Sequence, residues 1–148
     1  MNIEKQIDNK TMYMDLLLDA DPSERLVKSY LSDCDMFVLK DNNIAICIAV
    51  VIKIDDDIVE LKNLVTKKEY RSKGYASLMI KYLFNYYKDK YNKIIVGTSE
   101  NNIPFYNKQG FDKYEKTIKN FFIDNYDFEV IDGNLKCTDM FYYSKKLW

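Results

Sequence analysis

The run from Ile44 to Lys53 constrains the fold more than any other part of the sequence. A strand places successive side chains on opposite faces, and this run is apolar at nearly every position, so both faces must be buried. Such a strand belongs in the middle of a sheet that carries helices on both sides. We therefore expect an α/β or α+β fold in which this run is an inner strand.

The flanking segments predict the other elements of one mixed sheet. Asp21 is expected to cap a helix that runs to about Leu31, with Glu24 completing a capping box, and Asn101 to cap a short helix that ends at Gly110. Further strands are predicted at residues 2–7, 36–40, 58–66, 93–98, 111–120 and 136–146, and further helices at 11–18 and 74–88. Because 148 residues suit one compact domain, we expect residues 1–148 to form a single domain.

The composition disfavours several classes of function. The chain has 22 basic and 23 acidic side chains and a formal net charge of -1, so we expect no general attraction to nucleic acid or to an anionic membrane. Histidine is absent, which removes the usual general base and metal ligand, and the acidic turn from Asp55 to Asp57 lacks the spacing of a calcium loop. We therefore expect no metal, and acid–base chemistry must fall to Glu, Asp, Tyr, Lys or water.

The cysteines and the first residues indicate a cytoplasmic protein. Cys34, Cys47 and Cys137 are odd in number and include no C-x-x-C pair, so we expect reduced thiols, with Cys47 in the core rather than acting as a nucleophile. The segment from Met1 to Lys5 lacks the apolar core of a signal peptide. The longest apolar run ends at Ile52 and is shorter than the roughly 20 residues that a membrane-spanning helix needs.

The segment from Leu64 to Ser77 is the most informative about chemistry. A predicted strand ends there, a polar turn follows, and a helix begins at Gly74, with Arg71 and Lys73 adding positive charge. The first N–H groups of a helix have no partner within it and lie at the positive end of the helix dipole, which favours an anion. The spacing is neither that of a P-loop nor that of a Rossmann fingerprint. By itself the pattern fits an amphipathic helix that starts at a glycine equally well.

This segment resembles the acetyl-CoA signature of the GNAT acetyltransferase superfamily, Arg/Gln-x-x-Gly-x-Gly/Ala, with Arg71, Gly74 and Ala76 at the defining positions. The resemblance implies a single-domain GNAT fold, in which a mixed, mostly antiparallel sheet of about seven strands is flanked by about four helices. It also implies acetyl-CoA as co-substrate. The implied cofactor-binding residues are Arg71, Ser72, Lys73, Gly74, Tyr75, Ala76 and Ser77 around the pyrophosphate, and Leu64, Val65 and Thr66 along the pantetheine arm. Ser72 stands where glycine is frequent in the family.

A second segment, from Asn101 to Phe111, resembles the family's downstream motif, a short helix led by asparagine with a tyrosine near its middle and Gly-Phe at its end. The resemblance implies that Asn101 and Tyr106 contact the cofactor. It further implies that Tyr106 lies beside the cofactor sulfur, where a phenol of pKa roughly 10 can donate a proton to a leaving thiolate. Aromatic packing is the alternative role for Tyr106, as for any of the 13 tyrosines.

Glu60 is the candidate general base. It stands eleven positions before Arg71, where the matching strand of histone-type GNAT enzymes carries its catalytic glutamate. Simple alternation places Glu60, Lys62, Leu64 and Thr66 on one face of the strand and Val59, Leu61 and Val65 on the other, and a bulge would shift that phase. A surface glutamate paired with Lys62 explains Glu60 equally well, and both readings stay open.

The resemblance implies an N-acetyltransferase that moves an acetyl group directly from acetyl-CoA to a primary amine of a small molecule or peptide. The alternative is a non-catalytic acyl-CoA-binding regulatory module on the same fold, and a nucleic-acid or structural role is disfavoured. The aromatic and acidic segment from Phe121 to Asp127 would suit a cationic amine, although simple packing under the sheet is the favoured reading. The C-terminal residues resemble those of uncharacterised bacterial members, and a homodimer is compatible with this interpretation.

Overall fold

The computed structural model describes residues 1–148 and contains one seven-stranded sheet with the order β1-β2-β3-β4-β5-β9-β6. Every neighbouring pair is antiparallel except β4 and β5, so the predicted mixed, mostly antiparallel sheet is confirmed. The strands are β1 (Asn2–Gln6), β2 (Asp35–Asp41), β3 (Ile44–Lys53), β4 (Ile58–Thr66), β5 (Lys93–Thr98), β6 (Lys113–Ile118) and β9 (Met140–Lys146).

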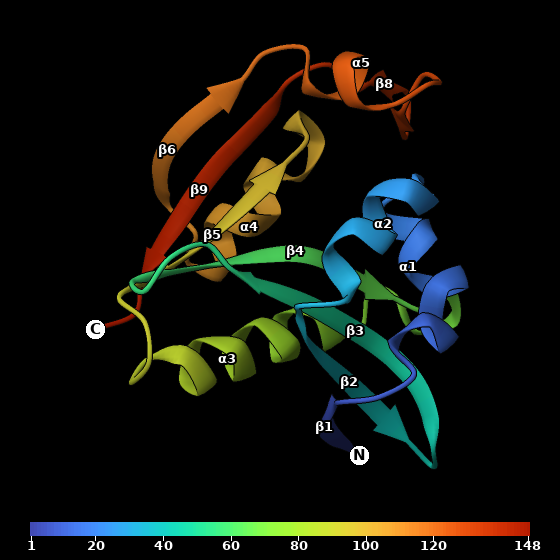
Figure 1. The fold of residues 1–148 in the computed structure, drawn as a ribbon, viewed down its shortest axis with the longest axis vertical. Coiled ribbons are helices and arrows are strands. Elements are labelled where there is room, and N and C mark those ends of the chain that lie inside the picture. The colour runs from blue at the N-terminus through green and yellow to red at the C-terminus, as the bar shows by residue number, and fades with distance from the viewer.

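Helices cover both faces of this sheet (Figure 1). On one face, α3 (Tyr75–Tyr87) and α4 (Ile103–Gln109) cover a core that includes Ala49 and Val51 of β3. On the other face, the 3-10 turn η1 (Lys10–Tyr13), α1 (Met14–Ala20) and α2 (Glu24–Leu31) cover a core that includes Ile48 and Val50. The central strand therefore supplies both cores, as its two apolar faces predict.

A β-bulge divides β4 into two halves with different phase. Val50 of β3 pairs with Asn63 and Val51 pairs with Leu61, so Lys62 is the extra residue of β4. After the bulge, Val65 joins the core under α1 and α2, while Leu64 packs against the core under α3. The simple alternation predicted from the sequence is therefore wrong beyond Leu61, because an extra residue exchanges the two faces.

The two parallel strands at the centre of the sheet separate halfway along their length. Ladder pairing between β4 and β5 runs from Ile58 opposite Lys93 to Leu61 opposite Val96 and stops there. The residues that follow in β4 still pair with β3, but their other edge has no strand beside it. The splay begins at the bulge, since the local twist of a bulged strand turns it away from its neighbour.

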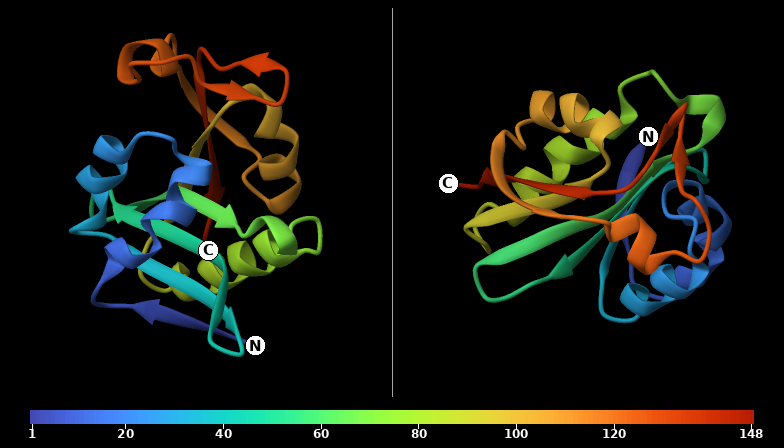
Figure 2. Two further views of the ribbon diagram at one scale, coloured as in Figure 1. Left: turned by 90° about the vertical axis from the view of Figure 1, so that its right-hand side faces the viewer. Right: turned by 90° about the horizontal axis from the view of Figure 1, so that it is seen from above.

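The connection between β6 and β9 is more ordered than the sequence predicts. It contains a fifth helix, α5 (Phe121–Asn125), and a small hairpin of β7 (Ile131–Asp132) and β8 (Leu135–Lys136), so the predicted strand 136–146 is interrupted before β9. Both Figure 1 and Figure 2 place α5 opposite α2. Arg25 of α2 donates a hydrogen bond to the Asn125 carbonyl at 3.1 Å, which joins the two regions.

Two predicted helix caps are wrong. Ser23 caps α2, because its side chain accepts a hydrogen bond from the Leu26 N–H at 3.2 Å. The Asp21 carboxylate instead accepts hydrogen bonds from the Ser23 N–H and from the Tyr30 and Tyr126 hydroxyls. Asn101 lies in a 3-10 turn, η3 (Glu100–Asn102), before α4 and makes no capping bond. Gly110 ends α4 in a left-handed conformation (φ 116°), as predicted. None of the helices has both the length and the apolar character needed to cross a membrane.

Candidate active site

A cleft of about 640 Å³ opens where β4 and β5 separate. Its walls come from the second half of β4, the end of β5, the α1–α2 connection, α4 and the segment between β6 and β9. Tyr106 reaches it from the α3 side of the sheet, whereas Glu60 and Asn63 lie on the α1 side. Side chains from both faces of the sheet therefore line the cleft.

One end of the cleft is built mainly from backbone. Leu64, Val65 and Thr66 line it with the strand edge that has no neighbour. Arg71 also lines it, and its Nε donates to the Thr66 carbonyl at 3.0 Å, which ties the turn after β4 to the end of that strand. The Arg71 guanidinium lies 4.0 Å from the Asp19 carboxylate and stays half exposed, so its charge remains accessible at the rim.

The turn then enters α3 through two left-handed residues. Ser72 has φ 62° and Gly74 has φ 89°, and Gly74 is the N-cap of α3 without any side-chain cap. A Cβ added to Gly74 would meet no atom within 4 Å, so the space beside the N-cap of α3 is open. The residues from Ser72 to Ser77 do not line the cleft; they continue the chain from Arg71, which does.

Tyr106 combines cleft exposure with burial of its phenol. It projects from α4, lines the cleft, and packs edge-on against Phe111 with ring centroids 5.8 Å apart. Burial, with a smaller effect from nearby Cys47, raises the pKa of Tyr106 to about 12. The hydroxyl therefore stays protonated at neutral pH and is available as a donor.

Glu60 is almost completely buried, with 7% of its surface exposed, and it faces the cleft. Lys62 Nζ lies 3.6 Å from its carboxylate and also 5.8 Å from the centre of the Tyr30 ring. Burial raises the pKa of Glu60, while Lys62 and more weakly Lys116 oppose that rise. The predicted pairing of Glu60 with Lys62 is present, but its predicted position on the surface is wrong, because the carboxylate is buried beside the cleft.

Asn101 does not line the cleft. Its side-chain amide donates to the Asp132 carbonyl at 2.7 Å, while the neighbouring Asn102 and Asp132 side chains line the cleft and bond to each other at 3.3 Å. Asn101 therefore holds the β7–β8 hairpin against α4.

Cys47 lies in the core, as predicted. It is fully buried, and burial raises the pKa of its thiol to about 11. A thiol in that state is a poor nucleophile. Cys34 and Cys137 are also buried and unpaired, and no cluster of His, Cys, Asp and Glu suited to a metal ion is found.

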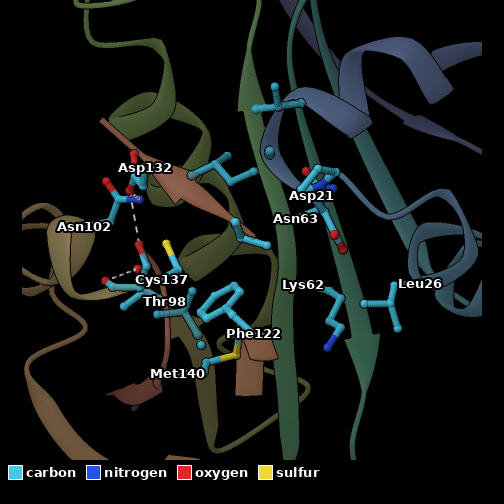
Figure 3. A pocket seen from close by; sticks show the side chains of 18 of the residues that line it. Asp21, Leu26, Lys62, Asn63, Thr98, Asn102, Phe122, Asp132, Cys137 and Met140 are labelled. Atoms are coloured by element: carbon cyan, nitrogen blue, oxygen red, sulfur yellow. Dashed lines mark hydrogen bonds between the residues drawn. The ribbon is translucent and has the colours of Figure 1, made fainter. Parts of the chain in front are cut away.

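The other end of the cleft is built from side chains that the motifs did not reveal. Figure 3 shows Asp21, Asn63, Leu26 and Lys62 on one side and Asp132, Asn102, Thr98 and Cys137 on the other. Phe121, Phe122 and Tyr126 also line this end, and their rings pack against one another. The one signal in the sequence was Asn63, because simple alternation places this polar residue on the same strand face as the apolar Val59, Leu61 and Val65.

A splayed mixed sheet, with a helix that starts at a left-handed glycine beside the splay, is the arrangement that the GNAT resemblance implies. Residues 32–113, more than half of the chain, match the family described as Acetyltransferase (GNAT) domain. The match includes β4, the Arg71 turn and Tyr106. The chain belongs to the GNAT acetyltransferase family and is an enzyme of the N-acetyltransferase type.

Individual relatives agree over almost the whole length. A GNAT family acetyltransferase from Elizabethkingia anophelis, solved with acetyl-CoA bound, is 30% identical with a TM-score of 0.92, covering 98% of this chain and 97% of that one. An IAA acetyltransferase from Bacillus cereus is 25% identical with a TM-score of 0.90, covering 98% of both chains. The uncharacterized N-acetyltransferase YvbK of Bacillus subtilis is 28% identical, covering 89% of this chain and 86% of its own.

Proposed function

We propose that this protein transfers an acetyl group directly from acetyl-CoA to a primary amine of a small molecule or peptide. The observation that carries the proposal is the end of β4–β5 pairing at Leu61 and Val96, which leaves a strand edge open immediately before the Gly74 helix start. Acetyl-CoA bound to the Elizabethkingia relative supports the choice of acyl donor.

The residues of this chain fit such a donor. Amide-containing pantetheine suits an unpaired strand edge, because the edge offers N–H and C=O groups in a regular row. A pyrophosphate suits the start of α3, since open space lies over Gly74 and the first amides of a 13-residue helix point outward. Arg71 and Lys73 supply positive charge beside that helix start. We assign cofactor contacts to Leu64, Val65, Thr66, Arg71, Ser72, Lys73, Gly74, Tyr75, Ala76 and Ser77, with Tyr106 at the sulfur.

Two side chains provide the acid–base chemistry in this proposal. Glu60, which pairs with Lys62, accepts a proton from the attacking amine directly or through a water molecule. Tyr106 keeps its proton at neutral pH and donates it to the sulfur as the carbon–sulfur bond breaks. The backbone N–H groups of Val65 or Thr66 are candidates to stabilise the oxyanion. Asn101 has no role in this scheme, because its amide is used by Asp132.

Calorimetry with acetyl-CoA, followed by a thiol-release assay over a panel of primary amines, tests this function. We expect micromolar to submillimolar binding and release of free CoA with at least one amine. Absence of binding at millimolar acetyl-CoA would overturn the assignment of the donor. Binding without thiol release from any amine would instead indicate a regulatory acyl-CoA-binding module.

A further inference from the structure

The acceptor end of the cleft carries negative charge that no cation of the protein neutralises. The carboxylates that line the cleft are Asp19, Asp21, Glu60 and Asp132, and the cations are Lys62 and Arg71. Lys62 pairs with Glu60, and Arg71 lies at 4.0 Å from Asp19. Asp21 and Asp132 form no ion pair, so two carboxylate charges remain in the cleft.

Asp21 is held by neutral donors. Tyr126 donates its hydroxyl to Oδ1 at 2.8 Å, and Tyr30 donates to Oδ2 at 3.0 Å. Burial, and the Asp21 charge itself, raise the pKa of both phenols, so they remain uncharged. The Ser23 N–H also donates to Oδ1, at 3.3 Å. These bonds fix the carboxylate in position without cancelling its charge, and Oδ2, which accepts a single bond, can accept a further one.

Asp132 stands on the opposite wall and is held in the same way. Ser99 and Asn102 donate to its Oδ2 at 3.2 Å and 3.3 Å, and its Oδ1 accepts no bond from the protein. Figure 3 shows Asp132 and Asp21 on either side of the β4 strand that crosses the cleft.

Asn63 supplies a separate indication that a donor-bearing ligand belongs here. It lines the cleft, is 4% exposed, and its Oδ1 is the one buried side-chain oxygen or nitrogen that lacks a hydrogen-bond partner. Its Nδ2 donates to the Leu17 carbonyl at 3.2 Å and to the Tyr30 hydroxyl at 3.1 Å. Because the Leu17 carbonyl can only accept, the amide cannot be turned over to satisfy Oδ1 from within the protein.

All of these free groups are hydrogen-bond acceptors, so the ligand group that suits them must donate hydrogen bonds and carry positive charge. A carboxylate or phosphate would be repelled. The ring of Tyr126 is stacked on Phe122, with centroids 5.7 Å apart, and aromatic faces also attract an ammonium group. Asn63 follows Glu60 by three positions along β4, a separation of roughly 10 Å or less.

We propose that the acceptor is an amine that carries a second, cationic nitrogen, as an alkyl diamine does. One nitrogen is acetylated near Glu60, and the other is held as an ammonium ion by Asp21 and the side-chain oxygen Oδ1 of Asn63, while Asp132 on the opposite wall adds negative charge at longer range. This inference rests on the proposed transfer to an amine and specifies the class of acceptor.

Calorimetric titration of diaminobutane and of butylamine, into the protein alone and into the protein with CoA, tests the inference without requiring turnover. We expect diaminobutane to bind at least about tenfold more tightly than butylamine, the range typical of a hydrogen bond to a charged group. Asp21→Asn should remove most of that preference, and Asp132→Asn on the other wall should reduce it. Asp127→Asn is the matched control, because Asp127 is exposed on the same segment and does not line the cleft.

Equal affinity for the two amines in the unaltered protein, or a preference that survives both Asp21→Asn and Asp132→Asn, would overturn the inference. Loss of the preference for diaminobutane in Asp127→Asn would also overturn it, because the preference would then depend on the net charge of the protein and not on the carboxylates in the cleft. The thiol-release assay separates this inference from the proposed function. Selective binding of diaminobutane without thiol release would contradict acetyl transfer but support the diamine site. Equal turnover of both amines would support acetyl transfer but contradict the preference for a diamine.

Discussion

The two ends of the cleft are built in different ways. The cofactor end is one continuous stretch of chain, from Leu64 to Ser77, and it presents backbone groups: a free strand edge and the first amides of α3. The acceptor end brings together side chains from α2, β4, β7 and the segment after α5. A backbone site tolerates many side chains, whereas a side-chain site depends on each one. The first should be conserved in function across relatives, and the second should decide what each relative acetylates.

Gly74→Glu should produce the largest effect on the cofactor end. It places a carboxylate and a Cβ over the first amides of α3, so we expect a loss of about a thousandfold in acetyl-CoA affinity, measured by calorimetry. Gly133→Glu is the control, because Gly133 also has a positive φ (63°) but lies in the β7–β8 hairpin. Equal losses in both variants would show that backbone strain, and not an anion site at α3, controls binding.

Tyr106→Phe should separate chemistry from binding. Loss of the hydroxyl removes the proposed acid, so we expect kcat to fall about a hundredfold while the Kd for acetyl-CoA changes less than about twofold. Tyr114→Phe removes an exposed hydroxyl from β6 and should leave both constants unchanged. An unaltered kcat in Tyr106→Phe would return this tyrosine to a packing role.

Glu60→Gln should lower kcat/KM by about tenfold to a hundredfold. A loss of only about tenfold is expected if a water molecule can replace the base. Burial raises the pKa of Glu60, so the rate of the unaltered protein should fall as the pH drops through that raised value. The variant should lack this acidic limb in its profile of kcat/KM against pH. If the limb persists unchanged, another group is the base.

The same substitution has an opposite effect on stability. A carboxyl whose pKa is raised by folding is penalised when it is ionised, so its cost is present above the folded pKa and vanishes below the unfolded value of about 4.3. Glu60→Gln should therefore raise Tm at pH 8, and the gain should shrink as the pH approaches 4. A Tm gain that grows toward low pH would contradict the burial argument.

Ser72→Gly should have the smallest effect. Ser72 holds a left-handed conformation, φ 62°, that glycine adopts without strain, and this relief is partly offset by the greater freedom of glycine in the unfolded chain. We expect a stability gain of about 1 kcal/mol or less, seen as a small rise in Tm. A clear loss of stability would indicate that the Ser72 side chain holds the turn.

The difference between the two ends also explains how far sequence reasoning reached. The doubly apolar run of β3 correctly predicted a sheet covered on both faces, and the Arg71–Ala76 pattern identified the family. Those features are local. Asp21 was predicted as a helix cap, but its carboxylate accepts hydrogen bonds from Tyr30 and Tyr126, and the latter lies 105 positions along the chain. A contact of that kind has no periodicity or spacing by which to be found.

The bulge at Lys62 is a second feature that the sequence does not predict, because it also depends on a contact between separate segments. Glu60 and Lys62 were correctly paired from their spacing, but Leu64, Val65 and Thr66 were placed on the wrong faces. Nothing in the sequence around Lys62 distinguishes an extra residue from an ordinary strand position. The bulge depends on the register between β3 and β4, which is a property of two strands together.

The open edge of β4 has a consequence for aggregation. A row of unpaired N–H and C=O groups is a template on which a strand of another molecule can add. In this protein that row lines a cleft, with α4 and β5 along one side and the α1–α2 connection along the other. The walls of the cleft therefore shield an unpaired strand edge that the active site requires. Substitutions that destabilise these walls should increase aggregation more than equally destabilising substitutions elsewhere.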